Sequence, residues 1–269
     1  MDELNFANLE IFLATSFFTF LAIFFRYVIL AALLDLFFSV FFKKEFVAKR
    51  ISQKPRSNTT LKKELIWSGI TSAIFAVTGV LMLVLWQNGY TKVYIIWEEF
   101  FWWYYPVSIL LFLAIHETYY YWLHRWMHRP GIFQLVHKAH HESITPSPWT
   151  AFSFHPLEGI LQALILPLFL LIFPIHYTAV VFLLLFMTLS SFINHLNVEI
   201  YPTGFEKNKI GKWIIGATHH TLHHTKFTAN YGLYFTFWDK WMDTESPEYE
   251  AILKRFKHGK DKEEAKVTG

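Results

Sequence analysis

Long apolar stretches alternate with polar ones along the chain, and their lengths predict helices that cross a membrane. Between Glu10 and Lys43 only Arg26 and Asp35 carry charge, and residues 65–91 carry none. Because about 20 apolar residues are enough for a helix to span a bilayer, each stretch predicts one spanning helix. Charges within a bilayer are costly, so we expect Arg26 and Asp35 to pair with other helices.

Two further apolar stretches predict the rest of the membrane domain. The run at 100–115 is interrupted by a proline and continues through several aromatic residues to His124, which predicts a third span that leaves the membrane through an aromatic belt. The run at 159–198 contains no Asp, Glu, Lys or Arg and is broken by Pro174 and His176. Two passes of about 15–17 residues suit this run better than one pass, so it predicts a helical hairpin.

Together these stretches predict an all-α integral membrane protein. We expect about four transmembrane helices, including the helical hairpin, and a cytoplasmic helical cap that holds a histidine-rich dimetal site. One domain over residues 1–269 accommodates this order of segments. Its parts are transmembrane helices with a basic cytoplasmic loop (1–123), histidine boxes 1 and 2 (124–158), the membrane hairpin (159–198), the cap with histidine box 3 (199–250) and a charged tail (251–269).

Basic residues predict which side of the membrane each polar segment faces. The segment 43–63 holds eight Lys or Arg residues, whereas the loop 87–99 holds only Lys92. By the positive-inside rule the first segment is cytoplasmic, and counting spans forward places 124–158 and 199–269 on the same side. The last residues lack a dilysine-type signal, which favours a bacterial inner membrane over the endoplasmic reticulum as the location.

Composition limits the chemistry that the chain can perform. Hydrophobic residues make up 54% of the sequence and charged residues only 17%, which excludes an ordinary soluble globular protein and a disordered one. The absence of cysteine excludes disulfides, thiolate metal ligands and a cysteine nucleophile. Any metal site must therefore use His, Asp or Glu, and 13 of the 14 histidines lie between His116 and His224.

Three histidine boxes fall in the segments that we predict to be cytoplasmic. The first has the pattern H-x-x-x-H and the other two have H-x-x-H-H, spacings that put imidazoles on one face of a helix. The hairpin would return the chain to the same side, so the boxes can enclose one site with a histidine at the hairpin's end and another beside the third box. The ten candidate metal ligands are His124, His128, His137, His140, His141, His195, His219, His220, His223 and His224.

So many imidazoles exceed the roughly four ligands of one zinc ion, which indicates two metal ions. Imidazole binds Zn, Cu, Fe and Ni alike, so the ligand type does not name the metal. His155 is expected either to bind metal or to orient a ligand. Glu117 and Asp239 are expected to accept the N–H of a ligating imidazole, with a helix cap or an ion pair as the alternative. The histidines not expected to be ligands are His116, His176 and His258.

The boxes occur with other motifs in a combination that resembles the fatty acid hydroxylase/sterol desaturase superfamily. These motifs are Glu117, the stretch Phe154-His155-Pro156-Leu157-Glu158-Gly159, and Asn230-Tyr231-Gly232 leading to Phe237-Trp238-Asp239. The resemblance covers about residues 117–239. Within the superfamily, segment 217–224 and the motifs after it are most similar to the sterol C5-desaturase (lathosterol oxidase) branch, although Asp243 stands where many members have a glycine.

The resemblance implies an oxidoreductase that holds two iron ions, with zinc possible after purification. Such an enzyme uses O2 and electrons from an external donor to desaturate or hydroxylate a C–H bond of a membrane lipid, either sterol-like or fatty acyl/sphingoid. No haem-binding domain is expected in this chain, so a ferredoxin or cytochrome b5-like protein and a reductase would supply the electrons; no nucleic acid partner is expected. No catalytic side chain is expected beyond the metal ligands.

Two questions stay open from the sequence. A passage for the lipid is expected along aromatic side chains, for which ordinary packing is the alternative: Phe152, Phe154, Phe227, Tyr231 and Phe235. A histidine-rich membrane metal transporter and a dizinc membrane hydrolase are the alternative functions. Strict dependence of product formation on O2 would separate the oxidase from both.

Overall fold

The computed structural model describes residues 4–52, 54 and 57–256, and nearly all of its regular structure is helical. Three of the described helices are long and apolar enough to cross a membrane. They are α1 (Leu9–Leu36), which continues through a π-helical turn to Phe41, α3 (Asn58–Gln87) and α9 (Tyr177–Asn194). This confirms the predicted class, a helical membrane protein.

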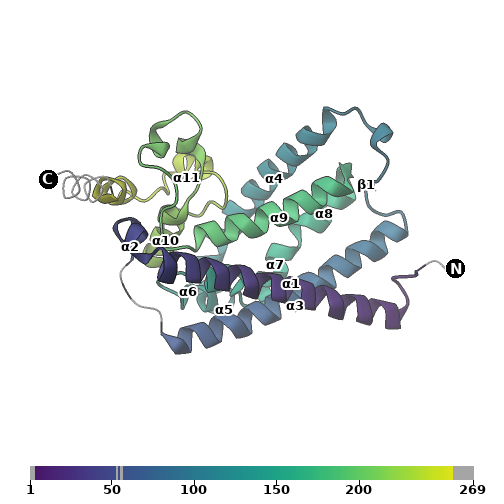
Figure 1. Ribbon diagram of the computed structural model, residues 1–269. Coiled ribbons are helices and arrows are strands. Elements are labelled where there is room, and N and C mark those ends of the chain that lie inside the picture. The colour runs from purple at the N-terminus through teal and green to yellow at the C-terminus, as the bar shows by residue number, and fades with distance from the viewer. Residues whose placement is uncertain (1–3, 53, 55–56, 257–269) are drawn as a thin grey trace.

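Side-chain caps set the starts of the first two long helices. The Asn8 side chain accepts hydrogen bonds from the backbone amides at the start of α1, and Ser57 does the same for α3. The two helices then lie side by side, as the dark and blue ribbons of Figure 1 show. Their outer faces carry exposed apolar residues such as Phe18 (67% exposed) and Leu33 (58% exposed), which suits contact with lipid.

The other two predicted membrane segments also form helices. Helix α4 (Tyr104–Met127) has the length of a span, but its second half carries buried polar side chains, and it is not among the three described helices that are long and apolar enough to cross a membrane. The predicted hairpin consists of α7 (Pro156–Ala163) and α8 (Ile165–Ile172) followed by α9. At its turn, β2 (Ile175–His176) pairs in parallel with β1 (Val93–Tyr94).

The short helices gather at one end of the molecule, and they include those that carry the second and third histidine boxes. Figure 1 shows α6, α10 and α11 at the end opposite the N-terminus and β1, with α2 beside them. The basic segment lies at this end too, because Arg50 pairs with Val198 and the Lys63 ammonium lies 2.6 Å from the Glu142 carboxylate. The short helices are α2 (Lys43–Phe46), α5 (Ile132–Val136), α6 (Lys138–His141), α10 (Ala217–Lys226) and α11 (Phe237–Trp241).

The two charges inside α1 differ in their surroundings. Asp35 accepts a hydrogen bond from the Trp149 indole at 2.9 Å, which ties α1 to the 3-10 turn Pro148–Phe152. Arg26 forms no hydrogen bond or ion pair with any residue that the structure describes, and its Nε is buried. The expected pairing with other helices is therefore confirmed for Asp35 and wrong for Arg26.

Candidate metal centre

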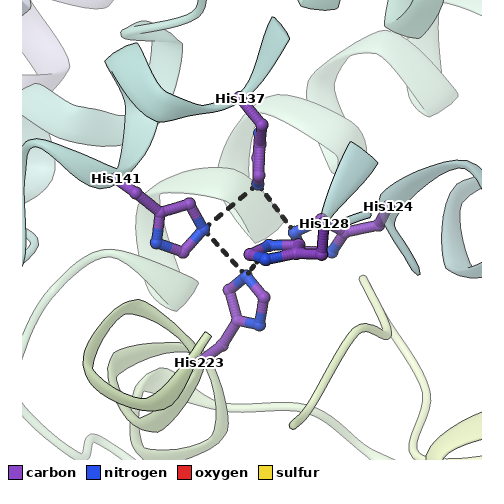
Figure 2. A group of neighbouring side chains, drawn as sticks. All are labelled: His124, His128, His137, His141 and His223. Carbon is purple, nitrogen blue, oxygen red and sulfur yellow. Dashed lines mark hydrogen bonds between the residues drawn. The ribbon is translucent and has the colours of Figure 1, made fainter. Parts of the chain in front are cut away.

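Nine of the ten candidate histidines lie in two adjoining groups. Within each group, one ring nitrogen from every member lies within 4.8 Å of the others. Figure 2 shows the first group, in which rings from three separate segments converge on one point. The five-histidine group consists of His124, His128, His137, His141 and His223, and the four-histidine group of His140, His195, His220 and His224.

Each H-x-x-H-H box divides its residues between the two groups. In the second box, His137 and His141 join the five-histidine group while His140 joins the other. In the third box, His223 joins the five-histidine group, whereas His220 and His224 join the other. The rings of His141 and His224 have centroids only 4.7 Å apart, so the two groups are neighbours.

Backbone carbonyls fix the tautomer of several of these imidazoles. His124 Nδ1 donates to the Tyr231 carbonyl at 2.9 Å, and His223 Nδ1 donates to the Ala229 carbonyl at 2.7 Å. In the four-histidine group, His140 and His195 donate in the same way to the carbonyls of residues 153 and 191. Because a carbonyl cannot donate, each Nδ1 carries the proton and each Nε2 presents a lone pair.

These lone pairs face one another, which is the arrangement that a cation stabilises. His140 Nε2 and His195 Nε2 are 3.4 Å apart, and neither has a proton to share. Neighbouring Nε2 atoms elsewhere in the groups are 2.9–3.2 Å apart. For a metal–nitrogen distance of about 2.1 Å, ligands at 90° are separated by about 3.0 Å and tetrahedral ligands by about 3.4 Å. The donor sets therefore fit one metal ion each.

Burial keeps these imidazoles neutral at pH 7. Burial first, and the neighbouring imidazoles next, lower the pKa of His141 and of His223 well below the usual value for histidine. The same two causes lower the pKa of His128 to about 2. A neutral imidazole keeps the lone pair that binds a metal, so the site is ready to bind without losing protons.

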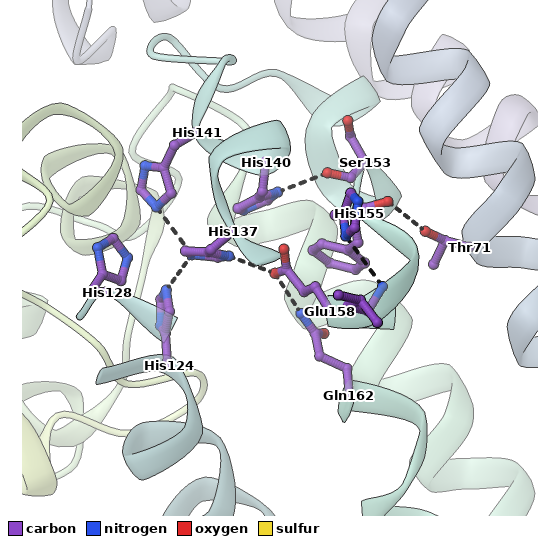
Figure 3. Close-up of polar contacts among 12 residues, drawn as sticks. Thr71, His124, His128, His137, His140, His141, Ser153, His155, Glu158 and Gln162 are labelled. Carbon is purple, nitrogen blue, oxygen red and sulfur yellow. Dashed lines mark hydrogen bonds and ion pairs between the residues drawn. The ribbon is translucent and has the colours of Figure 1, made fainter. Parts of the chain in front are cut away.

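Glu158 is the carboxylate that reaches a metal-facing histidine, a role that its motif did not predict. Its Oε1 lies 2.9 Å from His137 Nδ1, and both side chains are fully buried. Figure 3 shows Glu158 between His137 and Gln162, whose amide donates to the same oxygen at 2.9 Å. This contact favours the tautomer that leaves His137 Nε2 free for metal. The available signal was its position as the last charge before the 40-residue uncharged run.

Glu117 and Asp239 act on the backbone instead of on an imidazole. Glu117 accepts amide hydrogen bonds from residues 233–235, and Asp239 accepts them from Tyr231 at 2.8 Å and Gly232 at 2.9 Å. Neither forms a hydrogen bond with a histidine ring in the described part of the chain. The prediction that they accept the N–H of a ligating imidazole is wrong, because they hold the loop whose Tyr231 carbonyl orients His124.

Two candidate residues lie outside the groups: the predicted ligand His219, and His155, which was expected either to bind metal or to orient a ligand. The His219 ring stacks on Tyr249 with centroids 3.8 Å apart, and its Nε2 lies 3.5 Å from Glu245. His155 caps α7 by accepting from the Leu157 amide, and its ring does not reach the imidazoles. The structure thus corrects both expectations. Two of the histidines not expected to be ligands, at positions 116 and 176, also lie outside the groups, and His258 lies outside the described residues.

A mostly apolar cavity of about 630 Å³ ends at the four-histidine group. It is bounded by α1, α3, α8 and a stripe of α9, and both His195 and His220 line it. Of the predicted passage residues, Phe152 and Phe154 line this cavity. The other three do not, because Phe227 and Tyr231 pack on rings of the five-histidine group and Phe235 packs beside Phe237.

We expect Asp239→Asn to lower the free energy of unfolding by about 2 kcal/mol. The buried carboxylate accepts from two backbone amides and from the Thr244 hydroxyl at 2.7 Å, and an amide oxygen cannot serve all three. Asp243→Asn is the matched control, because Asp243 is exposed in the same segment. Thermal unfolding of the full chain in detergent measures both. Equal midpoints for the two variants would contradict the assigned role of Asp239.

The fold and the site together define a helical membrane protein with two adjoining histidine groups, each of which could hold a metal ion. The chain belongs to the fatty acid hydroxylase family, whose sequence profile matches residues 109–244. This confirms the resemblance drawn from the histidine boxes. No solved structure matches the chain.

Among curated relatives, the chain is similar to sterol desaturases. It is 31% identical over 216 residues to the Delta(7)-sterol 5(6)-desaturase ERG3B of Gibberella zeae, covering 76% of this chain and 64% of that protein. It is 32% identical over 183 residues to the lathosterol oxidase of Mus musculus, covering 67% and 59%. The chain therefore spans about half to two thirds of the length of these relatives. They come from a fungus and a mammal, which gives no support to the expected bacterial inner membrane.

Proposed function

We propose that this protein is an O2-dependent lipid oxidase that desaturates or hydroxylates a C–H bond of a membrane lipid at a two-iron centre. The observation that carries the proposal is the cavity, which is mostly apolar and ends at His195 and His220. A lipid inside it would bring a C–H bond directly to the four-histidine group. The named relatives, a sterol desaturase and a lathosterol oxidase, support an oxidation of this kind.

The contacts of the histidines and of the cavity walls support a separate role for each of these parts. Nine histidines hold the two iron ions, and iron with O2 supplies the oxidising power that side chains lack. Backbone carbonyls and Glu158 keep the Nε2 lone pairs aimed at the metals. The apolar walls exclude water and hold the lipid, whose position decides whether hydroxylation or desaturation follows.

The proposal also covers the side of the membrane on which the site lies and the source of its electrons. We place the end that carries the boxes and the basic segment in the cytoplasm, with four membrane-spanning segments counting α4 and the hairpin. Electrons would come from a separate ferredoxin or cytochrome b5-like protein with its reductase.

A dizinc hydrolase fits less well, because Glu158 faces His137 and is not free to act as a general base.

Labelled oxygen tests the proposed function. Membranes of a host that expresses the chain are supplied with a reducing system and isotopically labelled O2, and their lipids are analysed by mass spectrometry beside His220→Ala. A lipid that gains one labelled oxygen identifies a hydroxylase, and a lipid that loses two hydrogens without label identifies a desaturase. If iron is bound and neither product forms, the proposal is wrong.

We expect Gly79→Phe to reduce lipid turnover at least about tenfold while the metal content stays unchanged. Gly79 lines the cavity from α3, and a Cβ added there meets no atom within 4 Å, so the backbone leaves room for a side chain and the phenyl ring should extend into the lipid's space. Val77→Phe is the control, because Val77 is exposed on the same helix and does not line the cavity. Comparable turnover by the two variants would show that the lipid binds elsewhere.

A further inference from the structure

Arg26 is a cation inside the apolar helix α1 that has no anionic partner among the described residues. Its Nε is buried without a hydrogen-bond acceptor, and none of the described carboxylates forms an ion pair with it. The nearest acidic residue further along the helix, Asp35, is nine positions away, about 13 Å along the axis, and binds Trp149. A guanidinium in apolar surroundings without a counter-charge is costly, so a bound anion would stabilise it.

Arg26 stands where the interior cavity meets the outer surface of α1. Arg26, Ile23 and Thr19 recur at helical spacing on one face of α1, and all three line the cavity that ends at the four-histidine group. The same three residues line an open groove along α1. A lipid that enters from the bilayer along this groove would pass the guanidinium before it reaches the cavity.

The position of Arg26 along α1 also places it near the end of the cavity where the four-histidine group lies. Its neighbour Tyr27 stacks on Phe192, with ring centroids 6.1 Å apart, and on Phe152, with centroids 5.4 Å apart. Phe192 precedes His195 by one helical turn. A head group held by Arg26 would therefore keep the adjoining apolar part of the molecule inside the cavity, in reach of the histidines.

We propose that Arg26 binds the anionic head group, a carboxylate or a phosphate, of the amphiphile that fills the cavity. A guanidinium pairs with either anion through two parallel hydrogen bonds and neutralises its charge, whereas a lone hydroxyl leaves the charge of this half-buried guanidinium uncompensated. This inference rests on the proposed function, since it takes the cavity as the substrate's. It names an anionic amphiphile, in preference to a neutral sterol, as the substrate class.

Equilibrium binding in non-ionic detergent tests the proposal without iron turnover or an electron donor. The full chain is titrated with four radiolabelled probes: oleate, oleoyl lysophosphatidate, oleyl alcohol and cholesterol. We expect one of the two anions to bind at least about tenfold more tightly than both neutral probes. Arg26→Gln should remove this preference, Arg26→Lys should keep part of it, and Lys44→Gln, which removes an exposed charge outside the cavity, should keep all of it.

Three results would overturn the proposal. One is equal affinity for anionic and neutral probes, and another is an unchanged preference in Arg26→Gln with a normal unfolding midpoint. The third is anion binding that survives Gly79→Phe, because the anion would then sit on the lipid-facing groove and not in the cavity. If labelled O2 still yields a sterol product in any of these cases, the oxidase stands and only the anionic head group is excluded.

Discussion

Replacing His220 with alanine will lower the metal content from two ions per chain to one and reduce lipid oxidation at least about thousandfold. The Nε2 of His220 lies 2.9 Å from that of His195 and 3.2 Å from that of His224, so it supplies one of only four nitrogens in its group. It also lines the cavity. The five-histidine group keeps all its members in this variant and should still hold its ion.

The adjacent residue provides the control for this experiment. His219→Ala removes an imidazole next to His220 in the sequence, but its ring stacks on Tyr249 outside both groups. We expect this variant to retain two metal ions and most of the activity. Elemental analysis of the purified proteins gives the stoichiometry, and product formation is measured in parallel. The assignment of ligands fails if the two variants lose the same amount of metal.

Glu158→Gln will weaken metal binding by about ten- to hundredfold while the helical content stays unchanged. The carboxylate lies 2.9 Å from His137 Nδ1 in a fully buried pair. An amide can turn its N–H toward that nitrogen, which would favour the tautomer whose Nε2 carries the proton and cannot bind metal. Loss of one ligand from the five-histidine group would follow.

Chelator competition measures this affinity, with circular dichroism as the check on folding. Glu142→Gln is the matched control, because that carboxylate lies at the same end of the molecule but pairs with Lys63 at the surface. It should bind metal like the unmodified chain. Metal binding by Glu158→Gln at the unmodified affinity would show that the tautomer of His137 does not depend on this carboxylate.

The carboxylates show where sequence reasoning about the site reached its limit. Glu117, Glu158 and Asp239 all lie in or beside the motifs that resemble the family, and any of them could have oriented an imidazole. Only Glu158 contacts one, whereas the other two accept hydrogen bonds from the backbone of residues 231–235. A side chain reaches only a few ångströms, so the choice depended on which segments pack together.

The sequence by itself determined the membrane class, the positions of the long helices and the set of histidines from which the site is built. The lengths of the apolar runs predict the membrane class and the long helices, because crossing a bilayer depends on local composition. The spacing of the boxes predicts most of the histidines of the site. Tertiary structure alone decided how the ligands divide between two metals and why His220 joins while His219 does not. Successive residues on a helix point about 100° apart, so only the packing of α10 against its neighbours determines which ring faces the centre.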